Sequence, residues 1–314
     1  MPSVGPLMCL ASAVAFGAMA IFGKLAYDAG ATVGTLLAVR FLLAAALFWV
    51  LVAGTGAGRS LRALARRDLG IALALGAVGY SAQAGAYFAA LKRLDAALLS
   101  LLLYSFPAMV MVAAIALGRE RASRRTAVAL VLASAGLLLV LAGAGAGALD
   151  PLGTVLGLSA AVIYSTYILT SAGVAERVGP LVLSACVCTG AAATLTLAST
   201  AGGDLRLGDV SAAGFGWLAG LAVVSTVGAI SLFFAGLRRV GPTTASILST
   251  AEPLTTVLLA FLAFGESLGP VQLAGAALVL GAVLMLSATP RRARRREPPC
   301  RTYAVNWHTQ GRPR

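Results

Sequence analysis

Long apolar runs separated by short clusters of charge make up almost the whole chain. A helix that spans a bilayer needs about 20 apolar residues, because each residue rises about 1.5 Å across a hydrocarbon core about 30 Å thick. Two windows of sufficient length hold one charged residue each, Arg40 in 29–58 and Glu252 in 240–265. Eight more windows contain no Asp, Glu, Lys or Arg: 1–23, 69–91, 96–118, 126–149, 151–175, 178–203, 210–237 and 267–290. The pattern therefore predicts an all-α membrane protein with ten transmembrane helices.

The composition supports this interpretation. Hydrophobic residues make up 59% of the 314 residues and charged residues only 11%, with a mean hydropathy of +0.92. A soluble domain carries roughly 25% charged residues, so this chain has too little charge to cover a surface that faces water. The pattern argues against a cytosolic enzyme and against a nucleic-acid-binding protein. No HExxH, GxSxG or GxxxxGK[ST] motif occurs, and we expect neither enzymatic activity nor a cofactor.

The distribution of arginine and lysine predicts the orientation in the membrane. If the N-terminus is cytoplasmic, the inner loops and the tail carry 19 Arg, whereas the outer loops carry only Lys92, Arg93 and Arg206. Cytoplasmic loops are enriched in Arg and Lys, so both termini are expected inside. The basic segment after residue 290 is expected to lie near anionic lipid.

The chain contains an internal repeat. Residues 88–120 align with residues 234–266 at a constant offset of 146, with nine identities among 33 positions. The identities include a mid-helix proline, at 107 and 253, and a terminal glutamate, at 120 and 266. Because each half holds five helices, the second half enters the membrane upside down, an organisation common among secondary transporters. We expect three units: two five-helix repeats, 1–145 and 146–289, and a basic cytoplasmic tail, 290–314.

Several short motifs resemble the EamA-type family of the drug/metabolite transporter superfamily. They are GKLA at 23–26, the Arg40–Phe41 pair, ALKRLDAA at 90–97, YSFP at 104–107, GRE at 118–120, STAEP at 249–253 and GE at 265–266. The resemblance implies a ten-helix carrier that works by alternating access, as do members that export amino acids, other metabolites or drugs. It also implies that helices one, three, four, six, eight and nine line the pathway.

Polar and aromatic residues recur at helical spacing within the spans, which indicates either a helix–helix seam or the wall of a substrate cavity. Pro107 and Pro253 predict a kink or break in helices four and nine. The mid-span amide of Gln83 needs hydrogen-bond partners that a cavity would supply. The predicted substrate-binding set is Tyr80, Gln83, Tyr87, Ser100, Tyr104, Pro107, Tyr164, Tyr167, Ser246, Ser249, Thr250 and Pro253.

Three charged residues within or at the ends of spans are candidates for coupling or gating. Glu252 lies about 12 residues into helix nine, where a charge is costly. It is either a protonatable group that couples proton entry to substrate exit or a structural acid at a helix break. Arg40 lies at a similar depth, so an Arg40–Glu252 pair is one alternative. Lys24 ends helix one and either extends to the outer interface, attracts an anionic solute or serves as a gate.

The sequence thus predicts a secondary active transporter in the cytoplasmic (inner) membrane of a bacterium, with small organic solutes as partners. Export is the favoured direction; uptake, or a membrane protein with a structural or sensory role and no transport, are the alternatives. No nucleic-acid partner and no metal site are expected. The sequence leaves the substrate, the coupling ion and the oligomeric state open.

Overall fold

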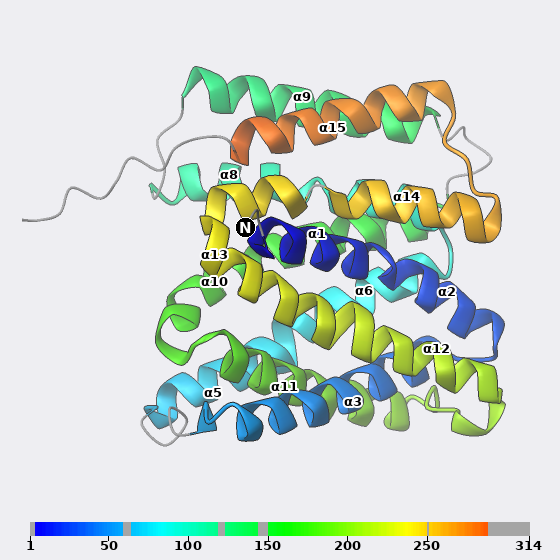
Figure 1. Ribbon diagram of the computed structural model, residues 1–314. Helices are drawn as coiled ribbons and strands as arrows, with labels where there is room; N and C mark the ends of the chain where they lie inside the picture. The colour runs from blue at the N-terminus through cyan, green and yellow to red at the C-terminus, as the bar shows by residue number, and fades with distance from the viewer. Residues whose placement is uncertain (1–3, 59–63, 119–122, 144–149, 250, 288–314) are drawn as a thin grey trace, which may run out of the picture.

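The computed structural model describes residues 4–58, 64–118, 123–143, 150–249 and 251–287, and all regular structure in these ranges is helical (Figure 1). Seven helical segments in the described ranges are long and apolar enough to cross a membrane, and three shorter apolar helices accompany them. Together they give the ten spans that the hydrophobic pattern predicts, and the all-α prediction is confirmed.

The first five spans are built from nine helical elements, because several spans are divided. They are α1 (Val4–Gly17) with α2 (Met19–Asp28), α3 (Val33–Gly54), α5 (Arg66–Ala74) with η1 (Leu75–Tyr80) and α6 (Ser81–Leu91), α7 (Ala96–Leu103) with α8 (Phe106–Ala116), and α9 (Arg124–Gly143). The second five spans are α10 (Pro151–Val178), α11 (Pro180–Ala201), α12 (Ala212–Ala222) with η3 (Val223–Gly228) and α13 (Ala229–Ser249), α14 (Ala251–Phe264) and α15 (Pro270–Ser287). A short turn, η2 (Leu207–Asp209), precedes α12.

The two halves have opposite orientations. Gly5, near the start of α1, approaches Val240 closely, whereas Asp150, at the start of α10, forms an ion pair with Arg93 in the loop between α6 and α7. The first helices of the two halves therefore begin at opposite ends of the molecule, as an inverted repeat requires. We call the end that contains Arg93 and Asp150 the outer end, because the charge distribution predicts that it faces the outside, and the opposite end the inner end.

Glycines allow equivalent helices of the two halves to pack closely. A Cβ atom at Gly136 on α9 would lie 2.7 Å from the carbonyl oxygen of Gly275 on α15, and a Cβ atom at Gly275 would lie 2.6 Å from the carbonyl oxygen of Gly136. The contact is reciprocal, as expected for the last spans of two repeats that are related by a pseudo-two-fold axis. Without a hydrophobic driving force between helices in lipid, such close backbone contact is a main source of association. Figure 1 shows α9 and α15 side by side at one edge of the molecule.

The ninth span differs from the prediction in its boundary. The sequence pattern ends the eighth helix at residue 237 and starts the ninth at residue 240. In the structure α13 remains helical to Ser249, and α14 begins at Ala251 (Figure 1). The ninth span is therefore shared between the end of α13 and α14.

Two π-helical turns occupy corresponding places in the two halves. η1 lies in the third span and η3 in the eighth, the third span of the second half. In each turn a hydroxyl group donates a hydrogen bond to a carbonyl oxygen five residues earlier: Ser81 to Gly76 (2.9 Å) and Thr226 to Leu221 (3.0 Å). Turns of this kind are frequent at functional sites.

Candidate transport site

The fourth span is broken in its middle, beside a predicted proline. α7 ends at Leu103 and α8 begins at Phe106, with Pro107 in the first turn of the new helix. Proline is accepted there because the first N–H groups of a helix have no partner within the helix. The break that the sequence predicts at Pro107 is confirmed, and it places Tyr104 at the junction of the two helices.

Tyr104 connects the two repeats at this junction. Its hydroxyl oxygen lies 2.8 Å from the carbonyl oxygen of Ser249 and 3.1 Å from Oε2 of Glu252, both in the second repeat. Tyr104 is buried, whereas Glu252 is half-buried. Glu252, in the first turn of α14, therefore has a hydroxyl donor from the other repeat.

A ladder of aromatic rings extends from Tyr104 across the interior. Successive ring centroids are separated by 5.7 Å for Tyr104–Phe106, 4.8 Å for Phe106–Tyr164 and 6.4 Å for Tyr164–Tyr167. The ladder continues from Tyr167 to Tyr80 (5.6 Å) and then to Phe41 (5.5 Å). The rings come from α3, η1, α8, α10 and the break between α7 and α8. Four predicted tyrosines, at positions 80, 104, 164 and 167, are thus brought into one continuous contact.

Other predicted residues have different surroundings. Ser100 is buried, and its hydroxyl donates to the carbonyl oxygen of Ala97 in its own helix (2.8 Å). Tyr87 is 3% exposed and packs edge-on against Phe88. Gln83 is 9% exposed and has no protein hydrogen-bond partner within the described residues.

Not every predicted residue of the ninth span can be placed. Pro253 is buried in the first turn of α14. The Ser249 carbonyl oxygen accepts from Tyr104. The backbone of Ser246 lies in α13, but its side chain and the whole of Thr250 are outside the described part of the chain.

Arg40 lies at the other end of the aromatic ladder from Glu252. It is 2% exposed, its Nε donates to Thr226 Oγ1 (2.9 Å), and its guanidinium carbon lies 4.9 Å from the ring centroid of Phe41 and 5.2 Å from that of Phe88. No described carboxylate lies within 4.0 Å of the guanidinium. The alternative of a direct Arg40–Glu252 pair is therefore wrong, because similar depth in the membrane does not place two helices face to face.

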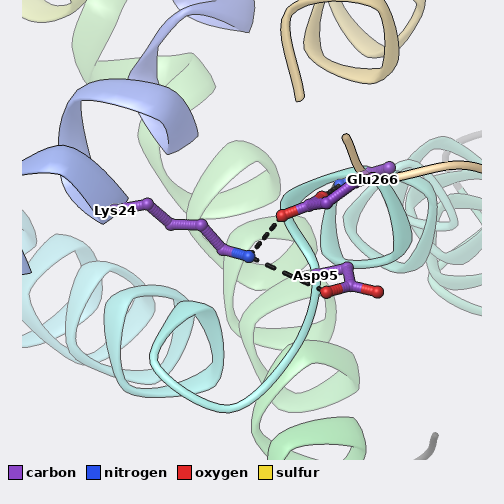
Figure 2. A network of polar contacts seen from close by, with 4 residues as sticks. Lys24, Asp95 and Glu266 are labelled. Carbon is purple, nitrogen blue, oxygen red and sulfur yellow. Dashed lines mark hydrogen bonds and ion pairs between the residues drawn. The ribbon is translucent and has the colours of Figure 1, made fainter. Parts of the chain in front are cut away.

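Lys24 forms a polar cluster at the outer end of the molecule (Figure 2). Its ammonium group pairs with Glu266 Oε1 and lies 3.8 Å from Oδ1 of Asp95. The other oxygen of Glu266 accepts from the backbone N–H of Ala97 in the first turn of α7 (3.2 Å), where a negative charge stabilises a helix. We call Lys24, Asp95 and Glu266 the outer cluster. It joins the end of α2, the start of α7 and the loop after α14.

Burial differs within the outer cluster. The side chains of Lys24 and Glu266 are 20% and 8% exposed, whereas Asp95 is 68% exposed. The surface is hollowed on both sides of the cluster, with Asp95 and Glu266 lining one recess and Lys24 and Asp95 lining the other. Lys24 is thus held by acids of both repeats, rather than extending freely to the interface as one interpretation of the sequence proposed.

The model of the EamA-like transporter family matches this chain twice, over residues 3–142 and 151–288. The chain belongs to the EamA-like transporter family. It is a multi-pass membrane transporter and not an enzyme.

Two curated relatives come from Bacillus subtilis. The "uncharacterized transporter YcbK" is 27% identical over 283 residues, which cover 87% of this chain and 89% of the relative. The "uncharacterized transporter YwfM" is 32% identical over 153 residues, which cover 48% and 50% of the two chains. The "uncharacterized inner membrane transporter YicL" of Salmonella typhimurium is 39% identical over 75 residues, or 24% of this chain and 25% of the relative.

A solved crystal structure has the same fold. It superposes with a TM-score of 0.63 at 22% sequence identity and covers 91% of this chain and 96% of the other chain. This similarity shows the fold of the EamA-like transporter and carries no information on its substrate.

Sequence reasoning missed three partners in this EamA-like transporter. The sequence marks Glu266 only as the repeat counterpart of Glu120, and Asp95 only as part of the ALKRLDAA motif. A carboxylate directly after an apolar span was the available signal for Glu266. Thr226, which binds Arg40, gave no signal, because a threonine within an apolar helix usually bonds to its own backbone.

Proposed function

We propose that this EamA-like transporter is a secondary active carrier that moves small organic metabolites, amino acids or related compounds, or drugs out of the cell by alternating access. We place it in the inner membrane of a bacterium, in line with the printed name of the Salmonella relative. The proposal rests on one observation, the uneven contact between two groups of helices.

Each group contains three of the spans that the family resemblance assigns to the pathway. The first group holds spans three, four and six (α5–η1–α6, α7–α8 and α10). The second holds spans one, eight and nine (α1–α2, α12–η3–α13 and α14). Apart from isolated contacts, the groups meet within the described residues through three helix pairs: α7 with α14, α2 with α6, and α2 with α7.

All three pairs lie toward the outer end. The inner halves of the same spans, such as α1 and α8, have no comparable contact across the two groups in the described ranges. Such an arrangement suits a carrier closed to the outside whose groups separate at the inner end. Tyr104 and Glu252, one from each group, lie where the packed outer half ends. The ladder of rings beside them suits an organic solute with an apolar body.

Two charged sites fit roles in the cycle. The outer cluster joins α2 and the loop after α14 to the start of α7, and we assign Lys24 the role of an outer gate. Glu252 is half-buried and shares its hydroxyl donor with the backbone, and we assign it the role of the proton-coupling group. Protonation would remove its charge and favour one arrangement of the two groups.

Flux into proteoliposomes tests the proposal. The full chain is reconstituted, and labelled amino acids and nucleosides are screened with and without a pH gradient. We expect gradient-dependent flux of at least one compound. Tyr104→Ala should reduce this flux at least about tenfold, because it removes both the ring and the hydroxyl, whereas Tyr104→Phe keeps the ring as a matched control.

Glu252→Gln tests the coupling role separately. It keeps the oxygen that faces Tyr104 but cannot titrate, so gradient-driven flux should be lost while exchange of labelled for unlabelled substrate continues. A variant that retains gradient-driven flux contradicts the coupling role. A wild-type protein that transports no member of the screen contradicts the proposed function.

A further inference from the structure

The buried guanidinium of Arg40 has more hydrogen-bonding capacity than its surroundings use. A guanidinium carries five N–H donors. Nε donates to Thr226 Oγ1 (2.9 Å), and the neighbouring Tyr80 hydroxyl provides at most one further acceptor. The guanidinium carbon lies over the rings of Phe41 and Phe88. The planar edge that would meet a carboxylate in other proteins has no carboxylate here within 4.0 Å among the described side chains.

An unpaired charge inside a membrane is expensive, and a protein retains it for a reason. Neither Glu252 nor Asp204 forms a direct ion pair with Arg40. Glu252 is bound by Tyr104 at the far end of the aromatic ladder. Asp204 accepts from the backbone N–H of Gly34 at the start of α3, about two helical turns from Arg40. Arg40 therefore has no direct ion-pair partner among the described residues.

The position of Arg40 connects the two repeats at their π-helical turns. Thr226 belongs to η3, and Tyr80 ends η1. Ser225, next to Thr226, is fully buried, and its hydroxyl has no hydrogen-bond partner within the described residues. A repeat offset of 146 places Cys186 opposite Arg40 in the second half, so the charge is present in one repeat only. One binding centre between the two repeats needs only a single charge, and this asymmetry fits such a centre.

We propose that Arg40 is the anion-binding group of the transport site and that the substrate carries a carboxylate. This inference rests on the proposed function and narrows it to one chemical class. A carboxylate takes two parallel N–H bonds from a guanidinium, and its single negative charge balances the single positive charge at this depth. The aromatic ladder that begins at Phe41 and Tyr80 then receives the apolar body of the solute. Drugs without an acidic group are not substrates of this site.

Binding of matched acids and amides tests the inference. The full chain is purified in detergent, and its affinity is measured by calorimetry for three pairs: L-phenylalanine and its amide, L-leucine and its amide, and 3-phenylpropionate and its amide. In each pair the amide has a similar shape but no anionic group. We expect at least one acid to bind about 10- to 100-fold more tightly than its amide, as for hydrogen bonds to a charged group.

Variants at Arg40 show whether this residue causes the preference for acids over amides. Arg40→Gln should bring the acid-to-amide ratio close to 1 with little change in the affinity for the amide. Arg40→Lys keeps the charge but not the planar fork, and it should lower the ratio about tenfold. Arg93→Gln removes one arginine from the exposed outer loop and serves as a matched control with an unchanged ratio. If Arg40→Gln is not recovered as folded protein, the acid-to-amide ratio of Arg40→Lys tests the inference instead.

Three outcomes overturn the inference. The first is a wild-type protein that binds every amide as tightly as its acid. The second is a folded Arg40→Gln or Arg40→Lys protein that keeps the full preference. The third is a wild-type protein that binds none of the acids. The proposed function survives these results if the flux assay still finds any transported compound, and it fails only if no compound in the screen is transported.

Discussion

The two halves of the fourth span, α7 and α8, are both apolar but differ sharply in burial. All eight residues of α7 are buried, and so are Tyr104 and Ser105 that follow it. In α8 only Ala114 is buried, and the other ten residues are half-buried or exposed. Because lipid and a packed interior both accept apolar side chains, composition does not set this difference. The contacts of each half with the other group of helices set it.

The comparison shows how one span can have an outer half in a closed, tightly packed region and an inner half in a loosely packed one. α7 lies against α2 and α14 and is capped by Glu266, whereas α8 packs mainly against α9, α10 and α15 of the described helices. The break at Tyr104 and Ser105 separates the two halves. A continuous helix would tilt as one rod, but a broken one lets its outer half remain packed while its inner half moves away.

Reversing a charge in the outer cluster should have the largest effect on the difference in packing between α7 and α8. Lys24→Glu places three carboxylates together, and losing the attraction should cost about 1 to 3 kcal/mol, between exposed and buried ion pairs. The closed state would weaken by about 5- to 150-fold. We expect a Ser100→Cys side chain on α7, with the native cysteines replaced by alanine, to react at least about tenfold faster with a membrane-impermeant maleimide from outside.

The matched controls for this experiment come from the same end of the molecule. Lys92→Glu makes the same charge change in the exposed loop before α7 and should leave labelling unchanged. The double reversal Lys24→Glu with Glu266→Lys restores the pair and should bring labelling back to within about threefold of the starting rate. Equal labelling of the Lys24→Glu and Lys92→Glu proteins would contradict the gate assignment.

Truncations in the two halves should affect stability unequally. Leu99 on α7 is fully buried, and Leu99→Ala should lower the free energy of unfolding by about 1 to 3 kcal/mol, because it leaves a cavity in a packed interface. Val112 on α8 is 51% exposed, and Val112→Ala should lower it by less than about 0.5 kcal/mol. Unfolding in mixed micelles measures both values. Similar losses would mean that the halves are packed alike.

Removing the exposed Arg93–Asp150 ion pair should have the smallest effect on stability. The Arg93 guanidinium, 2.8 Å from Oδ2 of Asp150, holds the pKa of that carboxyl below its usual range. The stabilisation is therefore present above the pKa of an unfolded aspartate, about 4, and is lost as the pH falls through the lowered value. Asp150→Asn should lower the Tm slightly at pH 7 and not at all at a pH below that range. A Tm difference that grows as the pH falls would contradict this assignment.

The spans, and the candidate residues of the proposed site, could be predicted from the sequence because they depend on local pattern. Ten apolar runs, the break at Pro107 and the aromatic residues of the proposed site follow from residue type and spacing alone. The partners of Lys24 and Arg40 could not be predicted from the sequence, because they depend on which faces of distant helices meet. Glu266 lies 242 residues from Lys24, and Thr226 lies 186 residues from Arg40. The π-helical turns were also missed, since a single inserted residue leaves no mark in a uniformly apolar run.

Two-sided labelling of α7 and α8 in the otherwise unchanged transporter tests the central claim most directly. Ser100→Cys reports on the outer half of the span, and Met111→Cys reports on the inner half, one helical turn after Pro107 on α8. A membrane-impermeant maleimide is applied to cells and, separately, to inside-out vesicles. We predict that Met111→Cys reacts from the cytoplasmic side only and that Ser100→Cys reacts from neither side. Reaction of either position from outside in the unchanged background would contradict the account.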